Sequence, residues 1–167
     1  MRALLTAAAA LLLAAAWVPA YSGAAHDRGV GGPTDFAVGA ARQSVHTFDF
    51  SAHAAPTAAD PFAATGHFEL NSRDGVQIFV RVTCLRVTGN RATLGGEVVR
   101  VIGVNFTAPG NEFVLFVEDN GEPGAGRDAA NGHFSFPGGK KCPPLPPPHL
   151  LPVPIDHGNI VVHGDQG

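Results

Sequence analysis

Short segments in which apolar and polar residues alternate are the feature that most limits the folds open to this chain. Such segments occupy 44–50, 66–70, 76–87 and 91–102, and turn signals separate them. Alternation with a period of two places apolar side chains on one face of a β-strand. Short strands with turns about every ten residues are typical of a small barrel or a β-sandwich. We therefore predict an all-β protein built as a small antiparallel β-barrel, with a β-sandwich as the alternative.

The first two segments each have one predominantly apolar face. His46, Phe48 and Phe50 share a face of the first segment, and Phe68 and Leu70 share a face of the second. The alternation thus predicts which side chains lie together on each strand.

The strongest strand signal covers 76–87, and Gly89-Asn90 provides a tight turn into 91–102. In 91–102 the alternation is interrupted, because the adjacent residues Val98 and Val99 are both apolar, and the apolar positions after them are shifted by one residue. This change predicts a bulge or a sharp bend. In 76–87 one face is expected to carry the alternate positions Val76, Ile78, Val80, Val82 and Cys84.

The remaining segments differ in how strongly they indicate a strand. Residues 112–117 are apolar on both faces, which predicts a strand covered on both sides, and 158–163 is predicted as a last short strand. Residues 121–157 form a Pro/Gly-rich insertion, predicted as a loop with at most one short strand near 133–136. Residues 26–42 show little periodicity and are predicted to be a flexible leader.

The N-terminus has the three parts of a secretory signal peptide. Met1-Arg2 gives a positive start, an apolar run follows over 3–18, and small residues continue through Ala25. Cleavage is expected after Ala20 or close to Ala25, and an uncleaved anchor is the alternative. We therefore predict a signal peptide over 1–25 and a protein that is secreted or held in the cell envelope of a bacterium.

Charge and length narrow the function classes. The chain carries 14 acidic and 11 basic residues, and the basic ones are dispersed. Nucleic-acid binding needs clustered Lys and Arg, so we expect no nucleic-acid partner. The length predicts a single β domain over 43–167. No second apolar segment follows the signal, so no membrane contact is expected after cleavage, and the partner is expected to be an unidentified extracellular molecule.

Cys84 and Cys142 are the two cysteines of the chain. In an oxidising compartment they are expected to form a disulfide. The loop of about 59 residues that the bridge closes corresponds to roughly 4 kcal/mol of stabilisation. Free thiols or metal ligands are the alternatives, although neither cysteine has a C-x-x-C partner. The bridge would fix the Pro/Gly-rich insertion to the sheet.

One Gly-rich loop carries several oxygen ligands, and the chain is rich in histidine. We expect no cofactor and an ordinary tight turn here, since Asp, Asn and Gly favour turns and the spacing is not that of an EF-hand. The alternative is a calcium site, for which the loop side chains Asp119, Asn120, Glu122 and Asp128 are the candidates. The eight histidines suggest zinc or copper, yet they form no H-x-H or H-x-x-x-H pair.

For an enzyme, the candidate carboxylates would have to face a histidine inside a barrel. The sequence has no G-x-S-x-G and no H-E-x-x-H motif, and oxidised cysteines cannot act as nucleophiles. We therefore assign no catalytic residue. The carboxylates considered are Asp49, Glu69, Glu97, Glu112 and Glu118.

Three blocks together resemble an uncharacterised all-β module of secreted actinobacterial proteins. They are CLRVTGNRATLGG at 84–96, VEDNGEPG at 117–124 and GNIVVH at 158–163. The resemblance covers the chain from Gln43 to its C-terminus. It implies an exported all-β module with no assigned activity, whose second cysteine lies in a variable Pro/Gly-rich segment.

The sequence thus predicts an exported, non-catalytic binding or structural module. The first alternative is a barrel that binds a small molecule, which requires an interior larger than its own side chains fill. The second alternative is an enzyme, which requires a His and a carboxylate that face each other in a cavity.

Overall fold

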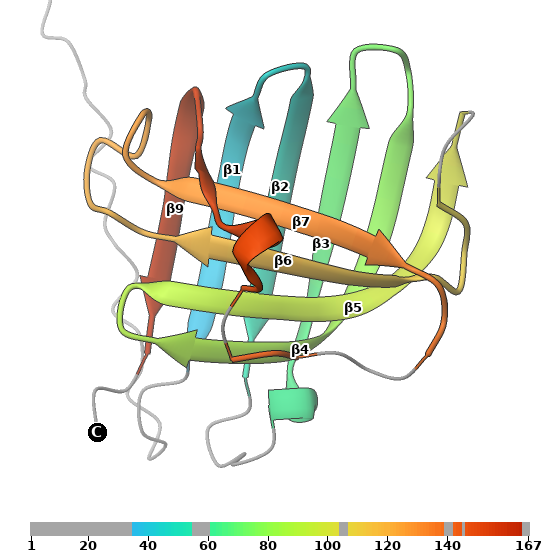
Figure 1. Ribbon diagram of the computed structural model, residues 1–167, viewed down its shortest axis with the longest axis horizontal. Helices are drawn as coiled ribbons and strands as arrows, with labels where there is room; N and C mark the ends of the chain where they lie inside the picture. The colour runs from blue at the N-terminus through green and yellow to red at the C-terminus, as the bar shows by residue number, and fades with distance from the viewer. Residues whose placement is uncertain (1–34, 55–60, 104–106, 139–141, 145, 165–167) are drawn as a thin grey trace, which may run out of the picture.

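The computed structural model describes residues 35–54, 61–103, 107–138, 142–144 and 146–164. The predicted signal peptide at 1–25 lies outside these residues. Nine strands and two short 3-10 turns make up the regular structure of the described residues (Figure 1). They are β1 (Phe36–Gln43), β2 (His46–His53), η1 (Pro61–Ala63), β3 (Thr65–Ser72), β4 (Gln77–Thr88), β5 (Arg91–Ile102), β6 (Glu112–Glu118), β7 (Ala129–Ser135), η2 (Pro148–Leu150), β8 (Val153–Pro154) and β9 (His157–His163).

All nine strands belong to one antiparallel sheet, in the order β8-β7-β6-β5-β4-β3-β2-β1-β9. Strands β1 to β8 follow one another as a meander, and β9 returns to pair with the free side of β1. The sheet curls into a half-barrel, so that β9, β1, β2 and β3 form one wall and β6 and β7 cross in front of it (Figure 1). The all-β prediction is confirmed, and the curled single sheet corresponds to the predicted barrel rather than to a two-sheet sandwich.

Strands β4 and β5 carry the bend from one wall to the other (Figure 1). Their pairing shifts between Phe79 and Val80 and between Val82 and Cys84, which leaves Val99 and Thr83 without a partner in the register. Bulges bend a strand and increase its twist. Val98 is fully buried whereas Val99 is 45% exposed, so the predicted bulge at this pair is confirmed.

The core lies on the concave face of the sheet, where cross-strand neighbours form layers. One layer joins Ala41, Phe48, Leu70 and Ile78, each opposite the next in the register. These residues belong to the core or pack against it. The shared face predicted for His46, Phe48 and Phe50 is therefore the inner face of β2.

The prediction of a flexible leader over 26–42 is wrong for residues 36–42. They form most of β1, which lies between β2 and β9. The inner positions of β1 carry only the small residues Ala37, Gly39 and Ala41, so the strand shows little apolar alternation. A Cβ at Gly39 would lie 2.7 Å from a ring carbon of Phe50, which explains the small residues.

We predict that Gly39→Val lowers the free energy of unfolding by about 1–3 kcal/mol, because it overpacks the core against Phe50. Ala40→Val is the matched control, since Ala40 is exposed on the opposite face of β1. Urea unfolding followed by circular dichroism measures both. Equal effects of the two variants would contradict the assigned orientation of β1.

The Pro-rich segment lies on the convex face of β5 and β6. Pro144, Pro146 and Pro152 border the same surface groove as Thr93 and Phe116. Phe116 is 2% exposed although it points away from the core, which is consistent with this cover. The prediction that 112–117 is covered on both faces is confirmed.

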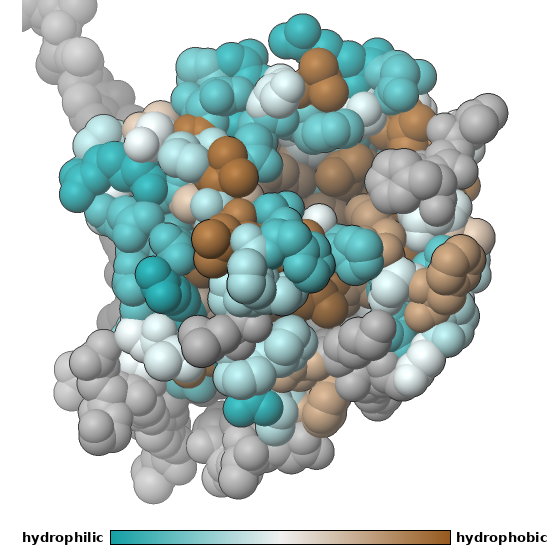
Figure 2. Space-filling view, viewed as in Figure 1, coloured by the Kyte–Doolittle hydropathy of each residue, from teal (hydrophilic) through white to brown (hydrophobic). Residues whose placement is uncertain are grey.

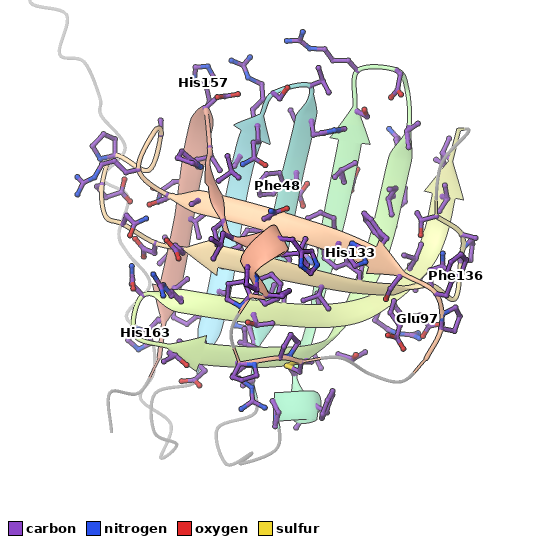
Figure 3. The ribbon with its side chains drawn as sticks, in the orientation of Figure 1. Phe48, Glu97, His133, Phe136, His157 and His163 are labelled. Carbon is purple, nitrogen blue, oxygen red and sulfur yellow. A yellow bond between two sulfur atoms is a disulfide. The ribbon has the colours of Figure 1, made fainter. Side chains whose placement is uncertain are left out.

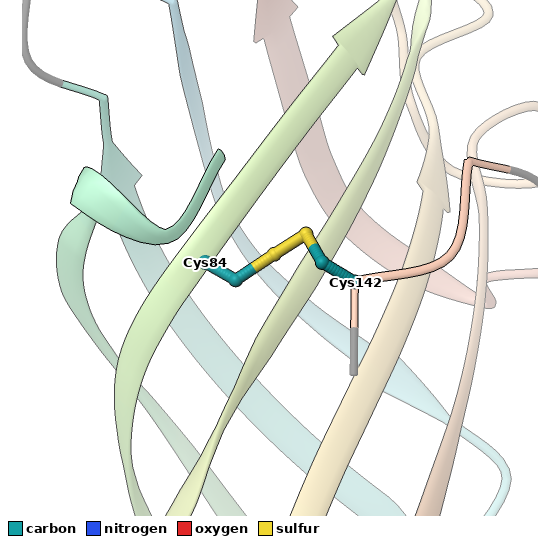
Figure 4. The surroundings of a disulfide bond; sticks show 2 residues. All are labelled: Cys84 and Cys142. Carbon is teal, nitrogen blue, oxygen red and sulfur yellow. A yellow bond between two sulfur atoms is a disulfide. The ribbon is translucent and has the colours of Figure 1, made fainter. Parts of the chain in front are cut away.

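A disulfide between Cys84 and Cys142 ties this segment to β4 (Figure 4). The two Cα atoms are 6.1 Å apart. The predicted pairing is confirmed, but the predicted face of Cys84 is wrong. The bulge at Thr83 reverses the alternation, so that Leu85 enters the core and Cys84 faces the Pro-rich segment.

The prediction that 121–157 is a loop with at most one short strand is also corrected. Strand β7 spans the seven residues Ala129–Ser135 and pairs with β6 over its whole length. Its inner positions include Ala130 and Gly132. These small residues hide the strand pattern in the same way as those of β1.

Candidate functional site

The concave face encloses a cavity of about 570 Å³. It lies between the inner face of β2–β4 and the strands β6 and β7, and its lining reaches the β1–β2 and β3–β4 turns at His46, Ser72 and Asp74. These two turns lie at the top of Figure 1. Brown, apolar atoms are visible in the hollow between the hydrophilic upper edge and β7 (Figure 2). A volume of this size is within the range of roughly 300–1,000 Å³ that is usual for small-molecule sites.

Aromatic side chains form much of the cavity wall. The ring centroids of Phe68 and Phe113 are 4.3 Å apart, and those of Phe113 and Phe134 are 4.8 Å apart. Phe48 continues the series at 6.2 Å from Phe68. Figure 3 shows Phe48 in the opening above β7. Gly132 of β7 also borders the cavity and lies against the ring of Phe113, because a Cβ at this position would be 3.2 Å from a Phe113 ring carbon.

Four polar residues border the open end of the cavity, and we call them the rim: Gln43, His46, Ser72 and Asp74. Three of them form one cross-strand row, because His46 lies opposite Gln43 on β1 and opposite Ser72 on β3. Asp74 follows in the β3–β4 turn. Asn131 and His133 of β7 also border the cavity, so the site has a largely apolar interior, a polar end and two further polar residues on β7.

The rim includes one carboxylate that is held in its ionised form. Hydrogen bonds from the Ser72 side chain, and then from the backbone N–H of Val76, lower the pKa of Asp74. The Val76 nitrogen is 3.4 Å from Asp74 Oδ1. Proximity to His46 acts in the same direction with a smaller effect.

His46 has an unpaired nitrogen. Its Nδ1 atom is buried and has no hydrogen-bond partner among the described residues. The other rim side chains have partners, since the Gln43 amide donates to Val153 O at 2.7 Å and Ser72 bonds Asp74. Among the rim side chains, His46 therefore has hydrogen-bonding capacity to spare.

The seam of the half-barrel, between β7–β8 and β1–β9, is bridged by side chains. Gln43 Nε2 donates to Ala130 O at 3.2 Å as well as to Val153 O. Asp156 Oδ2 accepts from the Ser44 backbone N–H at 2.7 Å. These bonds hold the wall that contains β7 against the end of β1.

Two carboxylates of the β6–β7 loop bridge the seam at its other end. Asp128 is 0% exposed and accepts hydrogen bonds from the backbone N–H groups of Asn120 and Ile160, both at 2.8 Å. Asp119 Oδ2 accepts from the Val162 N–H at 3.1 Å. Both thus bind the edge of β9, which has no neighbouring strand on that side.

The other two calcium candidates also have protein partners. Glu122 Oε1 accepts from Asn159 Nδ2 at 2.7 Å, and Asn120 Nδ2 donates to Arg127 O at 2.8 Å. Within the described residues, no group of three or more His, Cys, Asp or Glu is arranged to hold a metal ion. The hydrogen bonds favour the turn interpretation of this loop, and calcium binding stays a prediction.

The five carboxylates considered for catalysis do not line the cavity. They lie on the convex face, where Arg81 pairs with Glu97 at 2.9 Å and Arg91 pairs with Glu118 at 2.9 Å. Asp49 lies 3.5 Å from His67 on the same face. Figure 3 shows Glu97, His133, His157 and His163 far apart in the molecule.

The sequence indicates only part of this site. Alternation places His46 and Phe48 on one face of a strand, whereas no sequence pattern assigns Asp74 or Gln43 to a site. The alternation in 44–50 indicates the face of β2 that borders the cavity. That β7 borders the same cavity depends on long-range folding, which leaves no local pattern in the sequence.

Among the described residues no helix has the length and apolarity needed to cross a membrane. The disulfide indicates a non-reducing environment. Comparison with known proteins finds no matching family model, no matching curated protein and no matching solved structure. The resemblance to a secreted actinobacterial module therefore stays a prediction.

Proposed function

We propose that this protein is an exported, non-catalytic binding module whose half-barrel holds a small, predominantly apolar molecule. The observation that carries the proposal is the cavity of about 570 Å³ at the open end of the sheet. A purely structural module would be expected to fill this space with its own side chains, since protein interiors are close-packed.

The chemistry of the wall supports an apolar ligand. Phe48, Phe68 and Phe113 are each less than a tenth exposed, yet all three border the cavity. Burial of apolar surface contributes about 25 cal/mol per Å². Because these rings have little exposed surface of their own left to bury, most of the gain would come from burial of the ligand's apolar surface against them. The polar rim would orient the ligand, as a few placed polar groups do in small-molecule sites.

Export is supported by two observations of different kinds. The disulfide forms readily outside the cytoplasm, and the N-terminal sequence has the features of a signal peptide. A binding module of this kind would meet its ligand in the extracellular space or the cell envelope.

The rim does not favour an enzyme. His46 and Asp74 both border the cavity, but hydrogen bonds lower the pKa of Asp74. A general acid at neutral pH needs a raised carboxyl pKa, and a carboxylate with a lowered pKa is a weak base. We therefore propose binding without chemistry.

Binding of the uncharged fluorophore N-phenyl-1-naphthylamine to the mature, oxidised protein tests this proposal. We expect saturable binding of one fluorophore per chain. Leu70→Trp should weaken it by about tenfold or more, because the larger side chain fills space between Phe48 and Ile78. Val161→Trp is the matched control, since Val161 is exposed on β9 and does not line the cavity.

The outcomes separate clearly. Loss of binding in Leu70→Trp, with retention in Val161→Trp, supports the cavity as the site. No saturable binding to the wild type, or equal binding to both variants, contradicts it. Circular dichroism of each variant shows whether the sheet is intact.

A further inference from the structure

We propose that the cavity selects flat aromatic molecules that carry an uncharged hydroxyl group, and that His46 is the hydrogen-bond partner of that hydroxyl. This inference rests on the proposed binding function and specifies the ligand class. It follows from three features of the cavity: its aromatic wall, the unpaired nitrogen of His46 and the charge of Asp74.

The aromatic wall favours a flat ligand. The rings of Phe68, Phe113 and Phe134 follow one another at centroid distances of 4.3 Å and 4.8 Å. Aromatic rings in stacked or edge-to-face pairs gain stability beyond that from the burial of their area. Ala130 and Gly132 of β7 border the same cavity of about 570 Å³ and present almost no side chain. The remaining space can therefore receive a ring system that extends the series.

The polar end of the ligand would meet His46. Of its cross-strand neighbours, Gln43 donates through Nε2 to Val153 O, and Ser72 is hydrogen-bonded to Asp74. His46 Nδ1 has no partner among the described residues. An unpaired buried polar atom carries a desolvation penalty. A ligand hydroxyl that forms a hydrogen bond with Nδ1 removes this penalty. Where the ligand approaches the other edge of the imidazole, a 180° rotation of the ring about Cβ–Cγ brings Nδ1 to it.

The charge at the rim disfavours an acidic ligand. Asp74 is ionised at neutral pH and borders the same opening as His46. A carboxylate beside His46 would have a like charge nearby, whereas a neutral hydroxyl would not. A hydroxyl can also donate or accept, so it fits either tautomer of the imidazole.

Isothermal titration of the mature protein with naphthalene, 2-naphthol and 2-naphthoate at pH 7 tests the inference. We expect 2-naphthol to bind about fivefold to tenfold more tightly than naphthalene, which is the effect of one hydrogen bond. We expect 2-naphthoate to bind more weakly than 2-naphthol. The measured quantity is the ratio of the affinities for 2-naphthol and naphthalene. A general change in the cavity alters both affinities together and therefore has less effect on their ratio.

Two variants of His46 make the test specific. His46→Phe should remove the preference for 2-naphthol over naphthalene while naphthalene still binds, and His46→Gln should retain part of the preference. His67→Phe is the matched control, because His67 is exposed on the convex face beside Asp49. It should leave the preference unchanged.

Each contrary result points to a different error. Equal binding of naphthalene and 2-naphthol, or an unchanged preference in His46→Phe, overturns the role of His46 but leaves the apolar cavity intact. Tightest binding of 2-naphthoate overturns the role assigned to the charge of Asp74. Failure of all three compounds, together with N-phenyl-1-naphthylamine, overturns the proposed function itself.

Discussion

Replacement of both cysteines, Cys84→Ala with Cys142→Ala, is expected to lower the free energy of unfolding by about 4 kcal/mol. The bridge joins residues 58 apart in the sequence, so its loss returns much conformational freedom to the unfolded chain. It also holds the Pro-rich segment over Phe116, whose side chain would otherwise be exposed.

Urea unfolding of the oxidised wild type and of the double variant, followed by circular dichroism, measures this change. Reduction of the wild type is the control and should give the same loss as the substitutions. A loss below about 1 kcal/mol in both experiments would contradict the role given to the bridge, since natural disulfides in small domains contribute about 2–5 kcal/mol.

Asp128→Ala is expected to lower the free energy of unfolding by about 3–5 kcal/mol, an effect as large as that of losing the disulfide. The carboxylate is fully buried and accepts hydrogen bonds from the backbone N–H groups of Asn120 and Ile160. Its removal leaves two buried donors unpaired, each at about 1–3 kcal/mol.

The comparison with Asp49→Ala makes this prediction specific. Asp49 is an exposed aspartate beside His67, and such pairs contribute at most about 1 kcal/mol. Both variants are measured by urea unfolding with calcium and with a chelator. We expect the large loss in Asp128→Ala under both conditions. A loss that appears only with calcium would instead favour the metal interpretation of the loop.

The sequence predicted those strands whose pattern is local. The hairpin at Gly89-Asn90 and the bulge at Val98–Val99 were both read from adjacent residues, and the structure confirms both. The apolar run 112–117 was correctly interpreted as a strand covered on both sides, because burial on two faces leaves no polar alternation.

Strand β1 was missed because its inner residues are determined by a neighbour. Gly39 and Ala41 are small where β2 presents Phe50 and Phe48 across the register. The large and small residues fit together in space but lie on different strands, so the alternation of β1 alone is weak. The same reason applies to Gly132 of β7, which contacts Phe113.

The candidate site was predicted only in part, because it depends on long-range contacts. The face shared by His46 and Phe48 follows from alternation within β2. The cavity itself arises because the bulged strands β4 and β5 bring β6 and β7 in front of that face. Likewise, Asp128 accepts a hydrogen bond from Ile160, 32 residues further along the chain, and no local motif indicates this.

The most direct test of the binding cavity is a titration of ¹⁵N-labelled mature protein with N-phenyl-1-naphthylamine, followed by amide NMR spectra. We predict saturable shifts confined to residues that border the cavity on β1–β4, β6 and β7 and in the β3–β4 turn, with the exposed face around Val161 unaffected. Absence of shifts, or shifts centred on the exposed residues Leu151 and Val153, would contradict the claim that the half-barrel is a small-molecule site.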